Sequence, residues 1–70
     1  MPLSLIKLES EVHVNRISGN DKTRTFLTNL GFVPGTPIRI VSEVNGDIII
    51  KVMDSRIAIS KEMASKIIVY

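Results

Sequence analysis

Alternation of apolar and polar residues with a period of two predicts most of the regular structure of this chain. Val12 and Val14 alternate with polar neighbours between Glu11 and Ile17, which indicates a strand with one face in water. The alternation breaks near Arg16, where we expect a β-bulge or the end of the strand.

A second alternating segment, Ile38–Val44, places its isoleucines inward and Arg39 and Glu43 outward. Asn45-Gly46 follows directly and is the dipeptide best suited to a type I′ hairpin turn. The sequence therefore predicts an antiparallel hairpin, and its second strand is apolar on both faces at Ile48-Ile49-Ile50.

The C-terminal half is predicted to continue as short elements joined by tight turns. They are a strand Asp47–Met53, a turn at Asp54-Ser55, a strand Arg56–Ile59, a helical turn Lys61–Ala64 capped by Ser60, and a closing strand Lys66–Tyr70.

One longer helix is predicted between the first two strands. Ser18-Gly19-Asn20 is a turn cluster, and either Asn20 or Asp21 is the candidate N-cap of a helix that runs to Leu30. Three threonines lower the helix propensity of this segment, so Leu27 and Leu30 must pack on the sheet to stabilise it.

The end of this helix carries the clearest local signal in the chain. Gly31 can adopt the left-handed conformation that ends a helix, and Phe32 and Leu27 are then the apolar pair of a Schellman motif. A type II turn centred on Pro34-Gly35 should follow, because proline and glycine suit its two central positions.

These elements predict a mostly β fold, a small closed barrel of five to six strands in a single domain over residues 1–70. Four apolar residues near the N-terminus, Leu3, Leu5, Ile6 and Leu8, fit no single phase. They are compatible with a short strand or with an extended arm that covers the end of the barrel.

Composition narrows the class of protein. Apolar residues make up 44% of the chain with only three aromatics, which predicts an aliphatic core.

The chain has no cysteine, no signal-peptide pattern and no apolar run long enough to span a bilayer, so we expect a cytoplasmic protein that reaches a membrane only through a partner. The net charge of +2 comes from interspersed acids and bases, unlike the clustered bases of a nucleic-acid binder.

The sequence resembles the FeoA family over nearly its whole length. The resemblance rests on Arg24-x-x-Leu27-x-x-Leu30-Gly31-Phe32-x-Pro34-Gly35-Thr36-Pro37-Ile38 and on Ile57-Ala58-Ile59 followed by Ala64-x-x-Ile67-x-Val69. It implies an SH3-like barrel and a role in bacterial ferrous iron uptake, as cytosolic partner of the FeoB-type membrane transporter. The family's usual glycine before the first long strand is absent, and Glu9-Ser10-Glu11 stands in its place.

Two further functions remain open beside a transporter accessory. The resemblance extends to the SH3-like module of iron-dependent repressors, which suggests a regulatory domain acting on a DNA-binding protein, although no helix-turn-helix pattern is present here. A small nucleic-acid-binding barrel is the third hypothesis, and steep salt dependence of binding would mark it.

Candidate catalytic and metal-binding residues are few. His13 is the single histidine, and with Glu11 it offers too few ligands for a closed metal site, so a solvent-facing strand histidine is the simpler interpretation. Ser18, Thr36 and Ser60 lie at predicted turns or caps without a neighbouring base and orienting acid. We therefore expect no enzyme activity and no cofactor.

The candidate partner-binding residues are Arg24, Phe26 and Leu27. Phe26 lies about 100° around the helix from Leu27, so it is expected to be half exposed if Leu27 faces the core. An exposed aromatic is a favoured interface anchor, and the alternative is that Phe26 packs under the N-terminal arm. Scattered bases are either solvated or face an acidic partner: Lys22, Arg24, Arg39 and Lys51.

Overall fold

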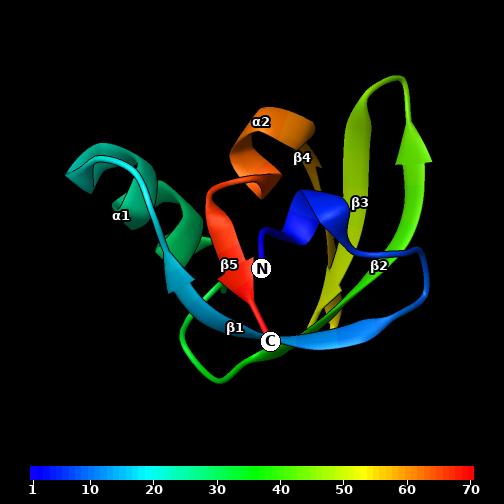
Figure 1. Ribbon diagram of the computed structural model, residues 1–70, viewed down its shortest axis with the longest axis horizontal. Coiled ribbons are helices and arrows are strands. Elements are labelled where there is room, and N and C mark those ends of the chain that lie inside the picture. Colours follow the sequence, from blue (N-terminus) through cyan, green and yellow to red (C-terminus); the bar gives the residue numbers. More distant parts are fainter.

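Five antiparallel strands form one strongly curved sheet in the order β4-β3-β2-β1-β5 (Figure 1). The computed structural model describes all residues, 1–70. Its elements are the 3-10 helix η1 (Leu3–Leu5), β1 (Glu11–Ile17), α1 (Asp21–Asn29), β2 (Pro37–Val44), β3 (Asp47–Val52), β4 (Ser55–Ser60), α2 (Lys61–Ala64) and β5 (Ile67–Val69).

The sheet curls into a small barrel, as the sequence predicts. No ladder joins the edge strands β4 and β5, and the chain crosses between them through α2, which packs against η1 (Figure 1). The N-terminal amine of Met1 donates to the carbonyl of Val69 at 3.0 Å, and Pro2 forms a bridge with Ile68. The first two residues therefore cover the outer edge of β5.

An apolar core fills the barrel and includes no polar side chain. Phe32 is its single aromatic member and is completely buried, so the prediction of an aliphatic core is confirmed. The core comprises Leu3, Val14, Leu27, Phe32, Ile38, Ile40, Ile48, Ile50, Val52, Ile59, Ala64, Ile67 and Val69.

The N-terminal segment is neither a strand nor an extended arm. Residues Leu3–Leu5 form a 3-10 turn, in which the amide of Leu5 donates to the carbonyl of Pro2 at 3.1 Å. The turn directs Leu3 into the core and leaves Leu5 exposed, which explains why the apolar residues fit no strand phase.

Two bulges shape the sheet. The predicted irregularity in β1 is confirmed, because the pairing with β5 shifts register between Val14 and Arg16. A second shift, in β2, lies between Ile40 and Ser42, so that Val41 is the extra residue.

The bulge at Val41 corrects one prediction about β2. Glu43 pairs directly with Ile48, and paired residues lie on the same face of a sheet, so Glu43 lies on the face of the core residue Ile48 and not on the outer face, although its side chain stays exposed. Its carboxylate accepts from Nζ of Lys61, at the start of α2, at 2.7 Å. The single extra residue inverts the alternation, which a strict period of two does not foresee.

The β2–β3 turn is formed by Asn45-Gly46, with φ of 50° and 84°, as expected for type I′. The next turn is one residue earlier than predicted, because Val52 pairs with Ser55 and Met53-Asp54 is the loop. Met53 takes φ of 56°, a conformation that glycine normally supplies. The closing strand is also shorter than predicted and comprises Ile67–Val69.

Helix α1 begins and ends with the predicted motifs. Asn20 is the N-cap, and its Oδ1 accepts from the amide of Thr23 at 2.8 Å. At the other end the amide of Gly31 donates to Thr28 at 3.0 Å and that of Phe32 to Leu27 at 3.2 Å, which is the pair of bonds that defines a Schellman motif. The helix ends at Asn29, with Leu30 as its C-cap.

The turn after α1 is held against the first strand. The amide of Thr36 donates to the carbonyl of Val33 at 3.0 Å, and Gly35 has φ of 90°, as predicted for a type II turn. The amide of Gly35 also donates to the carbonyl of Val14 at 2.7 Å. This contact fixes the helix end relative to the sheet.

The turn before β1 places a non-glycine residue in the left-handed region. Glu9 has φ of 69°, and its amide donates to the carbonyl of Ile40 at 2.7 Å. The chain therefore adopts at Glu9 the conformation that a glycine would allow without strain.

Candidate functional site

The surface between α1 and α2 exposes an aromatic side chain. Phe26 is 50% exposed, and together with Lys22, Thr23 and Met63 it lines a shallow pocket. Lys22 and Phe26 are four residues apart on the helix and therefore share a face. We call these four residues the α1–α2 surface.

Phe26 does not pack under the N-terminal segment. Its neighbour across the pocket is Met63 of α2, and half of its side chain faces solvent. In Figure 1, α1 lies at the left and α2 at the top centre, and residues of both helices line the pocket. Of the two alternatives for Phe26, the half-exposed one is correct.

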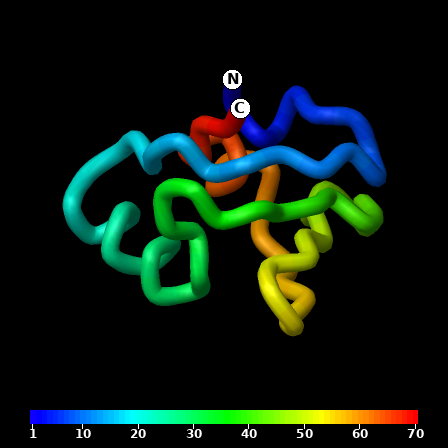
Figure 2. The backbone as a smooth tube through the Cα atoms, turned by 90° about the horizontal axis from the view of Figure 1, so that it is seen from below, coloured from blue at the N-terminus to red at the C-terminus, as the bar shows by residue number.

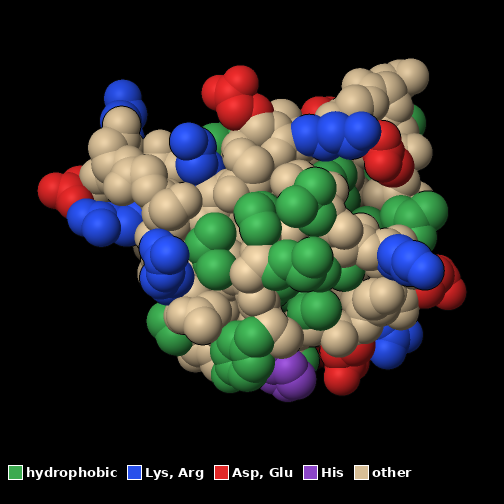
Figure 3. All heavy atoms as spheres, in the orientation of Figure 1, with side chains coloured by type: hydrophobic (Ala, Val, Ile, Leu, Met, Phe, Trp, Pro, Cys, Tyr) green, Lys and Arg blue, Asp and Glu red, His purple; other side chains and the backbone are tan.

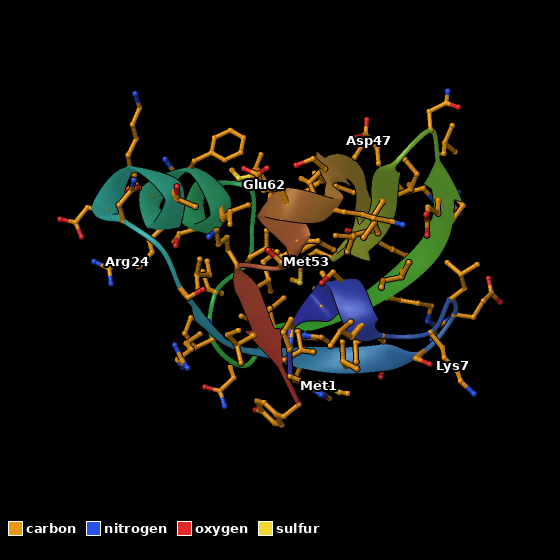
Figure 4. All side chains as sticks on the ribbon, turned by 45° about the horizontal axis from the view of Figure 1, so that its top comes forward. Met1, Lys7, Arg24, Asp47, Met53 and Glu62 are labelled. Atoms are coloured by element: carbon orange, nitrogen blue, oxygen red, sulfur yellow. The ribbon has the colours of Figure 1, made fainter.

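Arg24 does not join Phe26 as the sequence analysis expected. Residues two apart on a helix differ by about 200° in direction and do not face each other. Arg24 instead pairs with the carboxylate of Asp21 on α1, and Figure 4 shows it on the side of α1 away from α2. The base beside Phe26 is Lys22.

Leu27 also lies outside the accessible surface. Its side chain is completely buried in the core, so it has no exposed atoms to offer a partner. Its contribution is to hold α1 on the sheet, which fixes the direction of Phe26. Leu30 is only partly buried at the edge of the same core.

Lys22 and Met63 belong to the α1–α2 surface but were not among the predicted partner-binding residues, and the sequence contained a signal for Lys22 only. The spacing of four between Lys22 and Phe26 places them together on any helix. Met63 carried no such signal, because α2 meets α1 only through the folding of the intervening strands.

A second apolar area lies around the two chain ends. Green side chains gather at the centre of the face shown in Figure 3, over the region that η1 and β5 occupy in Figure 1. Met1, Leu5 and Tyr70 are the large apolar residues of these segments that are mostly exposed. These residues are different from those of the α1–α2 surface.

His13 and Glu11 have separate partners. The ring of His13 stacks on Tyr70, with 5.7 Å between ring centroids and 24° between planes. Glu11 meets Nη2 of Arg39 at 3.4 Å. No group of three or more His, Asp or Glu side chains converges as a metal site would require.

The three hydroxyl residues are engaged in backbone structure. Ser18 Oγ donates to the carbonyl of Lys66 at 3.3 Å, and Ser60 Oγ accepts from the amide of Met63 at 3.1 Å as the N-cap of α2. Thr36 closes the turn after α1.

None of the helices has the length and apolarity needed to cross a bilayer.

The comparison with family models shows the family to which the chain belongs. The FeoA domain model matches residues 1–70. The chain belongs to the FeoA family. The family is associated with ferrous iron transport, and its members are small SH3-like domains of accessory type.

Solved FeoA structures have the same fold. A crystal structure of an iron uptake regulatory protein (FeoA) has a TM-score of 0.89 and 35% sequence identity, over 99% of this chain and 92% of that one. FeoA of Stenotrophomonas maltophilia, solved with zinc and described as an SH3 domain protein, has a TM-score of 0.88 and 26% identity, over 100% of this chain and 89% of that one.

The FeoA fold also occurs inside a repressor. IdeR of T. acidophilum has a TM-score of 0.85 and 27% identity over 99% of this chain, which corresponds to 32% of the repressor. The comparison with curated proteins gave no match.

Proposed function

We propose that this FeoA-family chain is a non-enzymatic accessory protein of ferrous iron uptake. In this proposal it binds the cytosolic part of a FeoB-type transporter, is recruited to the inner face of the membrane by that partner, and modulates transport by contact alone.

The single observation that supports a contact site is the half-exposed phenyl ring of Phe26 between two helices. Aromatic side chains are enriched at interfaces and dominate their energetics, because a large rigid surface is desolvated at little cost in conformational entropy. Met63 adds a flexible apolar neighbour, and Lys22 places a positive charge at the rim of the pocket. A partner surface with an apolar knob and an adjacent carboxylate would complement this arrangement.

The test is a binding measurement with the purified cytosolic domain of a FeoB-type transporter from the same organism. Isothermal titration calorimetry is run with the wild-type chain and with Phe26→Ser. We expect the substitution to weaken binding at least about tenfold, since truncating an interface anchor typically costs 2 kcal/mol or more.

Leu8→Ser is the matched control. Leu8 is 53% exposed, close to the value for Phe26, and lies in the loop before β1. Binding by Leu8→Ser should equal that of the wild type. Equal binding by Phe26→Ser would reject the site, while absence of binding by the wild-type chain would contradict the proposed function.

Iron-dependent repressors provide a second candidate partner. The observation that favours it is the 27% identity with IdeR over nearly the whole of this chain. A chain of this fold acting in trans would compete with the repressor's own module. Titration of the wild-type chain into a repressor from the same organism tests this, and binding there without binding to the transporter domain would favour the regulatory function.

A further inference from the structure

Four charged side chains form a continuous cross-strand row on the outer face of the sheet. The register pairs Glu11 of β1 with Arg39 of β2, Arg39 with Lys51 of β3, and Lys51 with Arg56 of β4. Directly paired residues lie on one face, and the apolar neighbours of Lys51 in β3 are buried on the other face. We call Arg39, Lys51 and Arg56 the basic row.

The basic row works against the stability of the sheet. Like charges that are directly opposite on neighbouring strands destabilise the pairing. Glu11 meets Arg39 at one end of the row at 3.4 Å, but no carboxylate lies within ion-pair distance of Lys51 or Arg56. Two adjacent cations are therefore left without partners, a local conflict of the kind that natural proteins retain at functional sites.

The register that builds the row depends on the bulge in β2. The hairpin turn pairs Val44 with Asp47, and without an extra residue this register would place Lys51 opposite the buried Ile40. The bulge at Val41 advances the pairing by one residue and brings Lys51 beside Arg39 on the outside.

Apolar side chains flank the basic row on both sides. Ile49 and Ala58 form the neighbouring cross-strand pair on the same outer face, and Ala58 is exposed. On the other side lies Met53, which is 70% exposed although its φ of 56° disfavours a methionine. A hollow lined by residues of the row and by Pro37 and Met53 opens on this face. The β3–β4 hairpin, yellow in Figure 2, extends on the side of the molecule opposite the two termini.

We propose that the outer face of β2, β3 and β4 binds an acidic α-helix of a partner protein. Side chains opposite one another on neighbouring strands are about 4.5–5.5 Å apart, and residues three or four apart on a helix are about 5–6 Å apart. Carboxylates spaced in this way on one helix face would align with Arg39, Lys51 and Arg56. Apolar residues beside them would contact Ile49 and Met53.

The surroundings of the row favour a protein helix over other polyanions. Nonspecific binders of single-stranded nucleic acid stack bases on free aromatic rings, and His13, on the outer face of β1, already stacks on Tyr70. Asp54 follows Met53 at the hairpin tip, and Glu11 ends the row on β1, so a flat anionic bilayer would face both carboxylates, whereas a helix that crosses only β2, β3 and β4 stops short of Glu11. The proposal does not rest on the function proposed above, which uses the α1–α2 surface.

The experiment uses two synthetic peptides with identical composition. In the first, glutamates recur at positions i, i+4, i+7 and i+11 with leucines beside them, so that they form one face of the helix. In the second, the same residues are distributed around the helix. Binding to the full chain is measured at low salt by calorimetry, and backbone amide shifts are mapped by NMR. We expect the facial peptide to bind at least about tenfold more tightly and to shift amides of β2, β3 and β4.

Two charge-reversal variants of equal net charge distinguish the effect of the basic row from the effect of total charge. Lys51→Glu and Lys7→Glu change the total charge equally, both positions are exposed, and Lys7 belongs to neither proposed surface. Lys51→Glu should weaken binding of the facial peptide at least about tenfold, and Lys7→Glu should leave it within about twofold. Both variants are checked for a native amide spectrum before titration.

Several results would overturn the proposal. If the two peptides bound equally, or if the two charge-reversal variants lost affinity equally, binding would depend on net charge and not on the arrangement of the row. Tighter binding of single-stranded DNA, of phosphatidylglycerol vesicles or of an extended polyglutamate chain would assign the face to a different partner. Absence of any shift on β2, β3 and β4 would reject the site.

Discussion

Gly31 ends α1 and lies against the core of the barrel. Its replacement by alanine therefore tests both the backbone conformation at the helix end and the contact with the core. The residue has φ of 112°, and it provides one of the two hydrogen bonds of the Schellman motif. A Cβ added to Gly31 would lie 3.1 Å from Cγ1 of Val52, which is buried in the core.

Two costs add in this substitution. The backbone conformation costs a residue with a Cβ about 1–2 kcal/mol. The contact with Val52 costs about 1–2 kcal/mol more, at the lower end for overpacking, because a shift of a few tenths of an ångström relieves it. Gly31→Ala should therefore lower the free energy of unfolding by about 2–4 kcal/mol. A chain of this size is stable by roughly 3–10 kcal/mol in total, so the loss is large.

Gly35→Ala separates the two costs. Gly35 has φ of 90°, but nothing lies within 4 Å of a Cβ built there. This variant should lose only the conformational part, about 1–2 kcal/mol. Urea unfolding followed by circular dichroism gives both values, and an unchanged slope with denaturant shows that the folded and unfolded states remain comparable.

The reasoning would be refuted if Gly31→Ala destabilised the protein no more than Gly35→Ala. The contact with Val52 would then contribute nothing. A double substitution, Gly31→Ala with Val52→Ala, provides a further check, because removing Cγ1 should abolish the steric part of the cost.

Two further predictions concern backbone geometry and can be measured in the same unfolding assay. Glu9→Gly should raise the free energy of unfolding by about 1 kcal/mol, because φ of 69° strains a residue with a Cβ, whereas Glu9→Ala should give no such gain. Asn20→Ala should lower it by about 1 kcal/mol through loss of the bond to the amide of Thr23, and Asn20→Ser, which restores a capping oxygen, should recover most of that loss. A destabilised Glu9→Gly or a neutral Asn20→Ala would contradict these local assignments.

Much of the fold was predictable because its signals are local. The cap at Asn20, the Schellman motif at Gly31 and the turn at Asn45-Gly46 each depend on conformational preferences within a few residues. The paired strands followed from alternation, and their number and short turns indicated a small barrel, although no ladder joins its edge strands β4 and β5. The N-terminal 3-10 turn was missed because its hydrogen bonds leave no periodic pattern in three residues.

The candidate surfaces were decided by tertiary structure. The sequence by itself determined that Phe26 lies off the face of Leu27, but only the folding of the intervening strands brought α2 near enough to α1 for Met63 to line the same pocket. The basic row likewise joins residues from three strands, and its alignment rests on the single extra residue at Val41. Local preferences act over a few residues, whereas register and packing depend on which distant segments bury their apolar faces together, and no short stretch of sequence contains that information.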